Sequence, residues 1–282
     1  MVTARLHDGS PLEVTVLGDG PAVVLPVSMI VREGAEAEHM RAWGADPNVG
    51  PTLATGLADA GFRVIAADYE SHLAEHPKSG TLTADAVATD LLAVADAADA
   101  HRFAYYGYSW LALAGLQLAI RTDRLTALAM GGYPPLDGPY AAMLTVTRAG
   151  YRLALARDGQ PPVDIADVQP GDWDSAEVTV SPDQVGQYVT LYESLRDFDE
   201  RAALDRLDVP RLAFAGENDN ITYGADWDNA YVAIADPLRA HRDELVKRGW
   251  TVQILPGKDH MGAMHGATVL AILAPWLAAN CP

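Results

Sequence analysis

The sequence predicts an α/β fold with a mostly parallel central sheet, helices flanking that sheet, and a helical cap inserted late in the chain. Three observations support this prediction. Short apolar runs rich in branched residues recur along the chain, as buried parallel strands require. Segments of helical length and periodicity separate these runs, and such alternation favours a sheet covered on both faces. One long stretch, residues 134–208, breaks the alternation and contains only helical patterns.

The expected elements follow one another along the chain with clear boundary signals. The turn Gly18-Asp19-Gly20-Pro21 separates the first two strands, and Gly61 is a natural helix stop. Strands are expected at residues 12–17, 22–27, 62–67, 103–106, 125–131, 211–215 and 251–255. Helices are expected at residues 51–60, 83–100, 110–120, 140–157, 184–196, 241–248 and 268–279.

The insertion defines the expected domain organisation. Residues 1–133 and 209–282 are predicted to form one core domain, and residues 134–208 a helical cap between two strands of its sheet. The two helices of the cap are separated by a Pro- and Asp-rich stretch at residues 160–174. Insertions of this length usually carry function.

Composition excludes several classes of protein. The 282 residues are 49% hydrophobic, and the net charge of -18 disfavours binding to nucleic acid or to anionic membranes. No apolar run approaches the roughly 20 residues of a membrane span, and the N-terminus lacks the apolar core of a signal peptide, so a cytoplasmic protein is expected. The only cysteine, Cys281, excludes an internal disulfide and a thiolate metal cluster. No histidine pair has metal-ligand spacing, and we expect neither metal nor cofactor.

The strongest local signal is Gly107-Tyr108-Ser109-Trp110-Leu111, between an expected strand and an expected helix. A serine on such a turn has a strained backbone and a hydroxyl that projects from the edge of the sheet. Gly107 allows the chain to pass close by, and the helix that begins at Trp110 directs N–H groups toward developing negative charge. This context predicts that Ser109 is a nucleophile.

Two partners for Ser109 follow the last two expected strands. Asp219 comes after residues 211–215 and His260 after residues 251–255, and open α/β sheets place their sites at these strand ends. A serine hydroxyl needs a base, and a histidine base needs a carboxylate that fixes its tautomer. We therefore expect His260 as the general base and Asp219 as its orienting acid. Competing candidates are Glu217 and Asp137 for the acid, and His265 for the base.

With these segments the chain resembles the α/β-hydrolase fold superfamily along essentially its whole length. The resemblance rests on GYSW at the turn, GEND after the penultimate strand and PGKDH after the last one, supported by GDGPAVVL, LADAGFRVIAADYESH and LDRLDVPRLAFAGE. It implies attack by Ser109, a covalent acyl-enzyme, and water activated through His260. The insertion falls where this superfamily places the cap that selects substrates.

The oxyanion hole departs from the superfamily's pattern. The resemblance implies the backbone N–H of Trp110 as one donor. Many relatives carry His-Gly after the early strand, where this chain has Pro26-Val27 followed by Ser28. Proline has no N–H, so the second donor is expected to be the backbone of Val27 or Ser28, or the Ser28 hydroxyl.

A second departure is Leu111, where the turn usually has a small residue. We expect Ala112 and Ala114 to make room for its side chain. Apolar and aromatic residues near the expected site are candidates for lining a substrate pocket. These candidates are Tyr108, Met29, Trp43 and Tyr133.

These observations predict a serine hydrolase that cleaves an ester, lactone or thioester bond of a small to medium apolar substrate. The nucleophile is a serine, whereas dehalogenases and epoxide hydrolases of this fold use aspartate. The altered oxyanion hole leaves an alternative, an enzyme that uses the same fold for a non-hydrolytic step of secondary metabolism such as cyclisation, lyase chemistry or acyl transfer. A catalytically silent ligand-binding protein is a third hypothesis, which the intact triad disfavours.

Overall fold

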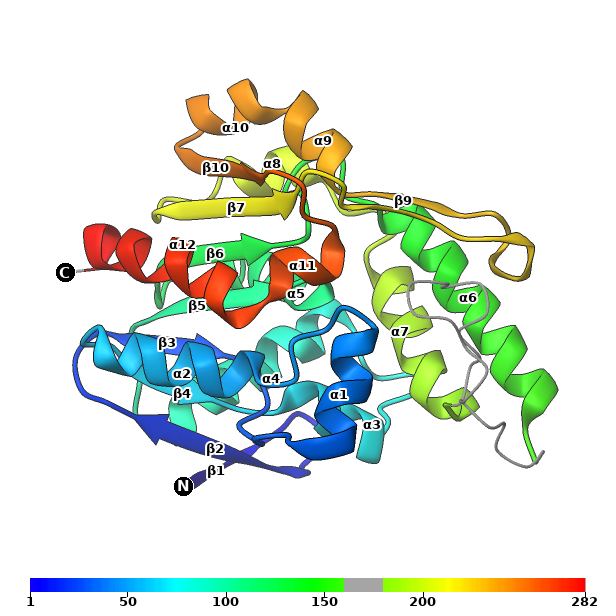
Figure 1. Ribbon diagram of the computed structural model, residues 1–282, viewed down its shortest axis with the longest axis horizontal. Coiled ribbons are helices and arrows are strands. Elements are labelled where there is room, and N and C mark those ends of the chain that lie inside the picture. The colour runs from blue at the N-terminus through cyan, green and yellow to red at the C-terminus, as the bar shows by residue number, and fades with distance from the viewer. Residues whose placement is uncertain (160–179, 282) are drawn as a thin grey trace.

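The central sheet has eight strands in the order β1-β2-β4-β3-β5-β6-β7-β10 (Figure 1). The computed structural model describes residues 1–159 and 180–281. Strands β1 and β2, and β2 and β4, pair antiparallel, and all other neighbours in the sheet are parallel. The strands are β1 (Val2–Arg5), β2 (Pro11–Leu17), β3 (Ala22–Leu25), β4 (Arg63–Ala66), β5 (Phe103–Tyr108), β6 (Leu125–Gly131), β7 (Arg211–Gly216) and β10 (Trp250–Leu255).

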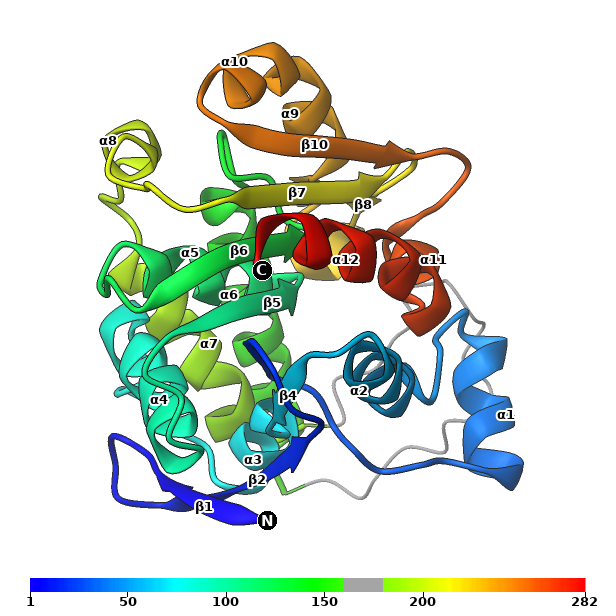
Figure 2. The same ribbon diagram turned by 90° about the vertical axis from the view of Figure 1, so that its left-hand side faces the viewer.

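Helices cover both faces of the sheet, which confirms the predicted fold class. On one face α2 (Val49–Asp59) packs against α12 (Gly266–Asn280), and on the other α4 (Ala84–Ala97) packs against α5 (Trp110–Ala119). Figure 2 shows the sheet between these two layers. Each layer buries its own apolar cluster against the sheet, and this burial holds the strand ends in fixed positions.

The described residues between β6 and β7 form no strand, as the sequence predicts. They contain α6 (Tyr140–Arg157), α7 (Pro182–Ser194) and the short α8 (Glu200–Leu204). Helices α6 and α7 pack together at the end of the sheet toward which the parallel strands point (Figure 1). The Pro- and Asp-rich stretch at residues 160–174 lies outside the described residues.

A buried glutamine fastens α7 to the segment at residues 73–78. Gln187 accepts a hydrogen bond from the Lys78 N–H at 3.0 Å and donates to the Leu73 carbonyl at 3.1 Å. At its N-terminus α7 has a capping box between Ser181 and Gln184. The helix therefore has both a defined start and a polar attachment to the loop after α3 (Tyr69–Glu75).

The elements that the sequence analysis missed are short. They are β1, α1 (Gly34–Ala42), α3, α8, β8 (Asn220–Thr222), the 3₁₀ turn Ala225–Trp227, β9 (Tyr231–Ala233), α9 (Ala235–Ala240) and α11 (His260–Met264). The expected helix at residues 241–248 is α10 (Arg242–Lys247). Strand β3 ends two residues before its predicted end because Pro26 follows and cannot donate to a ladder. Among residues 1–159 and 180–281, no helix is both long and apolar enough to cross a bilayer.

Candidate active site

Ser109 occupies a sharp turn between β5 and α5. Its φ of 56° and ψ of -131° lie in a region that residues with a side chain rarely adopt. Its N–H donates to the Gly131 carbonyl at 2.8 Å, and its carbonyl accepts from Ala112, so backbone hydrogen bonds hold the strained residue in place. A Cβ at Gly107 would lie 2.3 Å from the Leu111 carbonyl oxygen, and this contact explains the glycine.

His260 and Asp219 meet at the ends of two neighbouring strands. Strands β7 and β10 are parallel partners, so the loops that follow them emerge side by side. The His260 Nδ1 lies 2.7 Å from Asp219 Oδ1, and the Asp219 side chain is completely buried. This hydrogen bond leaves Nε2 as the ring nitrogen available to a neighbouring group.

Backbone contacts hold these two loops together. The Asn218 N–H donates to the Lys258 carbonyl at 2.8 Å, and the Gly257 N–H donates to Glu217 Oε2 at 2.9 Å. His260 begins α11, whose N-cap Asp259 accepts from the Gly262 N–H. The position of the imidazole is therefore set by both loops.

The competing residues have other partners. Asp137 Oδ2 lies 2.6 Å from His241 Nε2, and His265 Nε2 lies 2.7 Å from the Gly44 carbonyl. Glu217 binds the Gly257 backbone, as described above. Of the three acidic candidates, Asp219 is the one that the structure pairs with His260.

Tyr108 supports His260, a contact that the sequence analysis did not anticipate. Its hydroxyl donates to the His260 carbonyl at 2.7 Å, and the two ring centroids are 5.1 Å apart. Burial raises the pKa of Tyr108 well above its usual value, and the charge of Asp219 raises it further, so the phenol stays a neutral donor. A Cβ at Gly132 would lie 2.6 Å from the Tyr108 ring and 3.0 Å from His260 Cε1. The available signal was the glycine pair Gly131-Gly132 at the end of β6.

Two cavities adjoin both Ser109 and His260. The larger cavity, of about 320 Å³, is lined by residues that include Val27, Glu70, Tyr108 and Met264. The smaller cavity, of about 190 Å³, lies toward the insertion. Its lining is mostly apolar and aromatic and includes Tyr133, Pro139, Met143, Tyr192, Ile221, Tyr223, Val232 and Ile234.

The expected pocket residues divide between these two cavities. Tyr108 lines the larger cavity and Tyr133 the smaller one, and both side chains are otherwise buried. Met29 packs against the core cluster under α2. Trp43 is the C-cap residue directly after α1. Neither Met29 nor Trp43 lines either cavity.

The loop expected to supply the second oxyanion donor lies against the larger cavity, which Pro26, Val27 and Ser28 all line. The Val27 N–H donates to the Leu25 carbonyl at 2.9 Å, so this donor is already used within the loop. This bond argues against Val27 as the second oxyanion donor and leaves the Ser28 N–H or the Ser28 hydroxyl as the candidates. The Trp110 N–H is the first of α5 and has no acceptor within that helix.

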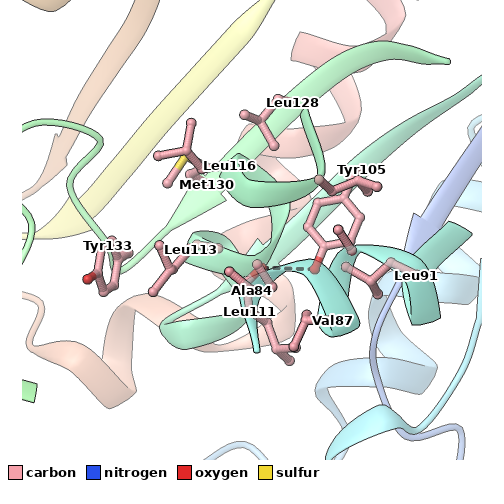
Figure 3. Packing of buried hydrophobic residues seen from close by; sticks show 14 of the residues in the cluster. Ala84, Val87, Leu91, Tyr105, Leu111, Leu113, Leu116, Leu128, Met130 and Tyr133 are labelled. Carbon is pink, nitrogen blue, oxygen red and sulfur yellow. Dashed lines mark hydrogen bonds between the residues drawn. The ribbon is translucent and has the colours of Figure 1, made fainter. Parts of the chain in front are cut away.

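The Leu111 side chain is buried in an apolar cluster that includes residues of α4. It is 5% exposed and belongs to the buried cluster that includes Ala84 and Val87 of α4 (Figure 3). Its carbonyl accepts a hydrogen bond from the Tyr105 hydroxyl at 2.8 Å. Leu111 is therefore buried in the apolar cluster to which α4 and α5 both contribute.

Glu70 is a site residue that the sequence analysis missed. The Trp110 Nε1 donates to Glu70 Oε1 at 2.6 Å, and the carboxylate lines the larger cavity. The Glu70 side chain reaches solvent, yet protein surrounds it on most sides, and the resulting desolvation raises the pKa of its carboxyl. The negative charge of Asp68 also raises this pKa, whereas the hydrogen bond from Trp110 lowers it. The available signal was its position just after β4, at the same edge of the sheet as Ser109.

Solved structures with the same arrangement of elements cover almost the whole chain. An enol-lactonase from Burkholderia xenovorans LB400 is 19% identical with a TM-score of 0.62, over 98% of this chain and 99% of that one. An esterase from Thermogutta terrifontis is 17% identical with a TM-score of 0.61, over 100% and 98% of the two chains. The epoxide hydrolase VrEH1 from Vigna radiata is 15% identical with a TM-score of 0.55, over 98% and 97%.

These likenesses identify the fold: the chain has the α/β-hydrolase fold, as the sequence resemblance implied. Neither a protein-family model nor a curated protein matches the sequence. The solved structures also include enzymes of different chemistry, so the reaction has to be argued from the site.

Proposed function

We propose that the protein is a serine hydrolase in which Ser109 attacks an ester, lactone or thioester carbonyl of a small to medium apolar substrate. The observation that carries this proposal is the Asp219–His260 hydrogen bond beside cavities that Ser109 also lines. The buried carboxylate fixes the tautomer of His260, leaving Nε2 to accept the serine proton.

The reaction would proceed in two steps. Ser109 Oγ forms a bond to the carbonyl carbon while its proton passes to His260, which then protonates the leaving group. Water, deprotonated by His260, releases the acyl group from Ser109. The Trp110 N–H and a donor from Ser28 would bind the oxyanion of each tetrahedral intermediate.

The walls of the site favour an apolar substrate. The smaller cavity is lined by Met143 of α6, Tyr192 of α7, and aromatic and branched side chains of the β8–β9 hairpin. We propose that residues 134–208 act as a cap, because Tyr133, Pro139, Met143 and Tyr192 in or beside this insertion reach the cavity. The named activities of the lactonase and esterase structures agree with acyl chemistry.

Labelling with a fluorophosphonate tests the proposal. The reagent should modify Ser109 in the native protein, as mapped by mass spectrometry, and Ser109→Ala should abolish the adduct. His260→Ala should slow labelling strongly, and His265→Ala is the matched control that should not. An unlabelled Ser109, or equal labelling in His260→Ala, would contradict the proposal.

A second candidate is a non-hydrolytic reaction on the same scaffold, such as cyclisation, lyase chemistry or acyl transfer. The observation that favours it is the Val27–Leu25 hydrogen bond, which leaves the oxyanion hole without that donor. Turnover of a panel of p-nitrophenyl esters, lactones and thioesters separates the two functions. Hydrolysis requires turnover of at least one of these, whereas the second candidate predicts labelling of Ser109 without turnover.

A further inference from the structure

Glu70 places a carboxylate beside the proposed nucleophile. It lies in the first turn of α3 and shares the larger cavity with Ser109 and His260. Its partner Trp110 directly follows Ser109 in the chain, so the hydrogen bond between Trp110 Nε1 and Glu70 Oε1 ties the carboxylate to the turn that carries Ser109.

The indole that orients Glu70 is itself held in place. The Trp110 ring lies with its centroid 5.4 Å from that of Tyr188 on α7 and 6.2 Å from that of Tyr69 on α3. The donor is therefore positioned by three elements of the fold. A carboxylate oriented in this way is preorganised to bind a ligand.

The other charged residues that line this cavity already have partners. Arg32 pairs with Glu36 at 2.8 Å, and Asp46 accepts hydrogen bonds from the backbone N–H groups of Asn48 and Gly266. Glu70 Oε2 has no hydrogen-bond partner within residues 1–159 and 180–281. Glu70 Oε2 is therefore available to a ligand that enters the larger cavity.

The surroundings of Glu70 suit a cation. Tyr106, Tyr108 and Trp110 line the same cavity, and aromatic rings together with a carboxylate are favourable surroundings for an ammonium group. The one positively charged arginine among the lining residues, Arg32, forms its ion pair with Glu36 and not with Glu70. A bound ammonium would supply the opposite charge that Glu70 lacks among the described residues.

We propose that Glu70 is a specificity-determining residue that selects substrates carrying a positively charged amine on the part that fills the larger cavity. This inference rests on the proposed function, and it divides the substrate into two parts. The apolar part occupies the smaller cavity and the cationic part the larger one, with the scissile carbonyl between them at Ser109.

Equilibrium binding tests Glu70 independently of catalysis. Calorimetry would measure hexyltrimethylammonium binding to Ser109→Ala protein, alone and combined with Glu70→Gln or Glu75→Gln. Glu70→Gln keeps the acceptor for Trp110 and removes the charge, and should weaken binding about tenfold, as expected for one close ion pair in a partly screened site. Glu75 lies exposed on the same helix, outside the cavity, so Glu75→Gln changes the net charge equally and should leave binding unchanged. Equal affinity in the Glu70→Gln and Glu75→Gln proteins, or no binding at all, would overturn the proposal.

Covalent labelling provides the second measurement. Three alkyl fluorophosphonates of equal chain length, ending in trimethylammonium, tert-butyl or carboxylate, would be compared by their second-order rates at Ser109. The cationic reagent should react fastest and the anionic one slowest, and Glu70→Gln should bring the first two rates together. A preference that persists in Glu70→Gln would overturn the role of Glu70. Failure of all three reagents would instead contradict the nucleophile, while the binding measurement still decides the cation site.

Discussion

Ser109, His260 and Asp219 differ in how their environments hold them. Ser109 has a strained backbone fixed by hydrogen bonds, His260 has a ring packed on Tyr108, and Asp219 is buried. Asp219 Oδ2 has no partner among the described residues, so the carboxylate depends on its bond to His260. A buried carboxylate with one partner is costly unless the imidazole stabilises it.

Replacing Asp219 by Asn should therefore abolish most of the activity. The amide can donate to His260 Nδ1 and so favour the wrong tautomer, and we expect kcat/KM to fall about 10³-fold or more. Steady-state kinetics on the best ester, lactone or thioester substrate would measure the loss. Asp137→Asn is the matched control, because Asp137 pairs with His241, and it should retain activity. Similar losses in both variants would refute the assignment of Asp219.

Gly132→Ala should damage the site more than the fold. An alanine there has a left-handed backbone, which costs about 1 kcal/mol, and its Cβ also overlaps Tyr108 and His260. Gly61→Ala introduces the same backbone cost where the structure shows open space. In urea unfolding, both variants should lose the backbone cost from their free energy of unfolding. Gly132→Ala should lose about 1–3 kcal/mol more because its Cβ overlaps neighbouring side chains. Only Gly132→Ala should slow fluorophosphonate labelling, and equal rates would contradict the proposed support of His260.

At the scale of elements, a polar network joins the β1–β2 turn to the segments around α3. The Lys78 ammonium is almost fully buried, lies 2.5 Å from Asp8 and donates to Ser10 Oγ. Ser10 Oγ also lies 3.0 Å from His72 Nε2. The Lys78 backbone in turn binds Gln187 of α7, so one short segment connects the edge of the sheet with the insertion.

This network predicts how stability depends on pH. Burial raises the pKa of Asp8, but hydrogen bonds from Lys78 and Ser10 outweigh it and leave the pKa well below its ordinary value. Asp8 therefore contributes stability above the unfolded-state pKa of about 4, and this contribution disappears as the pH falls further. Asp8→Asn should melt at a lower temperature than the native protein at pH 7, and the difference should shrink between about pH 4 and pH 2.

Thermal unfolding over this pH range would test the prediction. Asp19→Asn removes an exposed carboxylate from the turn between β2 and β3 and serves as the control. Its melting temperature should stay close to that of the native protein at every pH. A difference for Asp8→Asn that does not change with pH would show that the stabilisation comes from packing rather than from charge.

At the scale of the whole molecule, the dominant electrostatic feature is the net charge of -18. Most of the ion pairs among the described residues join side chains that are at least partly exposed, where each pair contributes little. The acidic groups in excess repel one another across the molecule. At an ionic strength of 0.1 M, salt largely screens the repulsion between exposed charges more than about 10 Å apart.

Salt should consequently stabilise the protein. We expect the melting temperature at pH 7 to rise between about 10 mM and 500 mM NaCl, because screening weakens the repulsion more than it weakens the exposed pairs. Differential scanning calorimetry at fixed pH would measure the change. A decrease with salt would show that the ion pairs outweigh the net charge.

The sequence by itself determined the strand–helix alternation, the place of the insertion and the residues proposed to act in catalysis. These features follow from local signals, namely apolar periodicity and turn chemistry at the ends of predicted strands, which need no knowledge of packing. The pairing of Asp219 rather than Asp137 with His260 was decided by the tertiary structure, because it depends on which strands are neighbours. Three further features were also decided by the tertiary structure. The Val27 N–H is used within its loop, Tyr108 supports His260, and the Glu70 carboxylate lies beside Trp110. Each is a contact between segments far apart in the chain or a backbone geometry without a sequence signature, and only the packing of the whole sheet creates it.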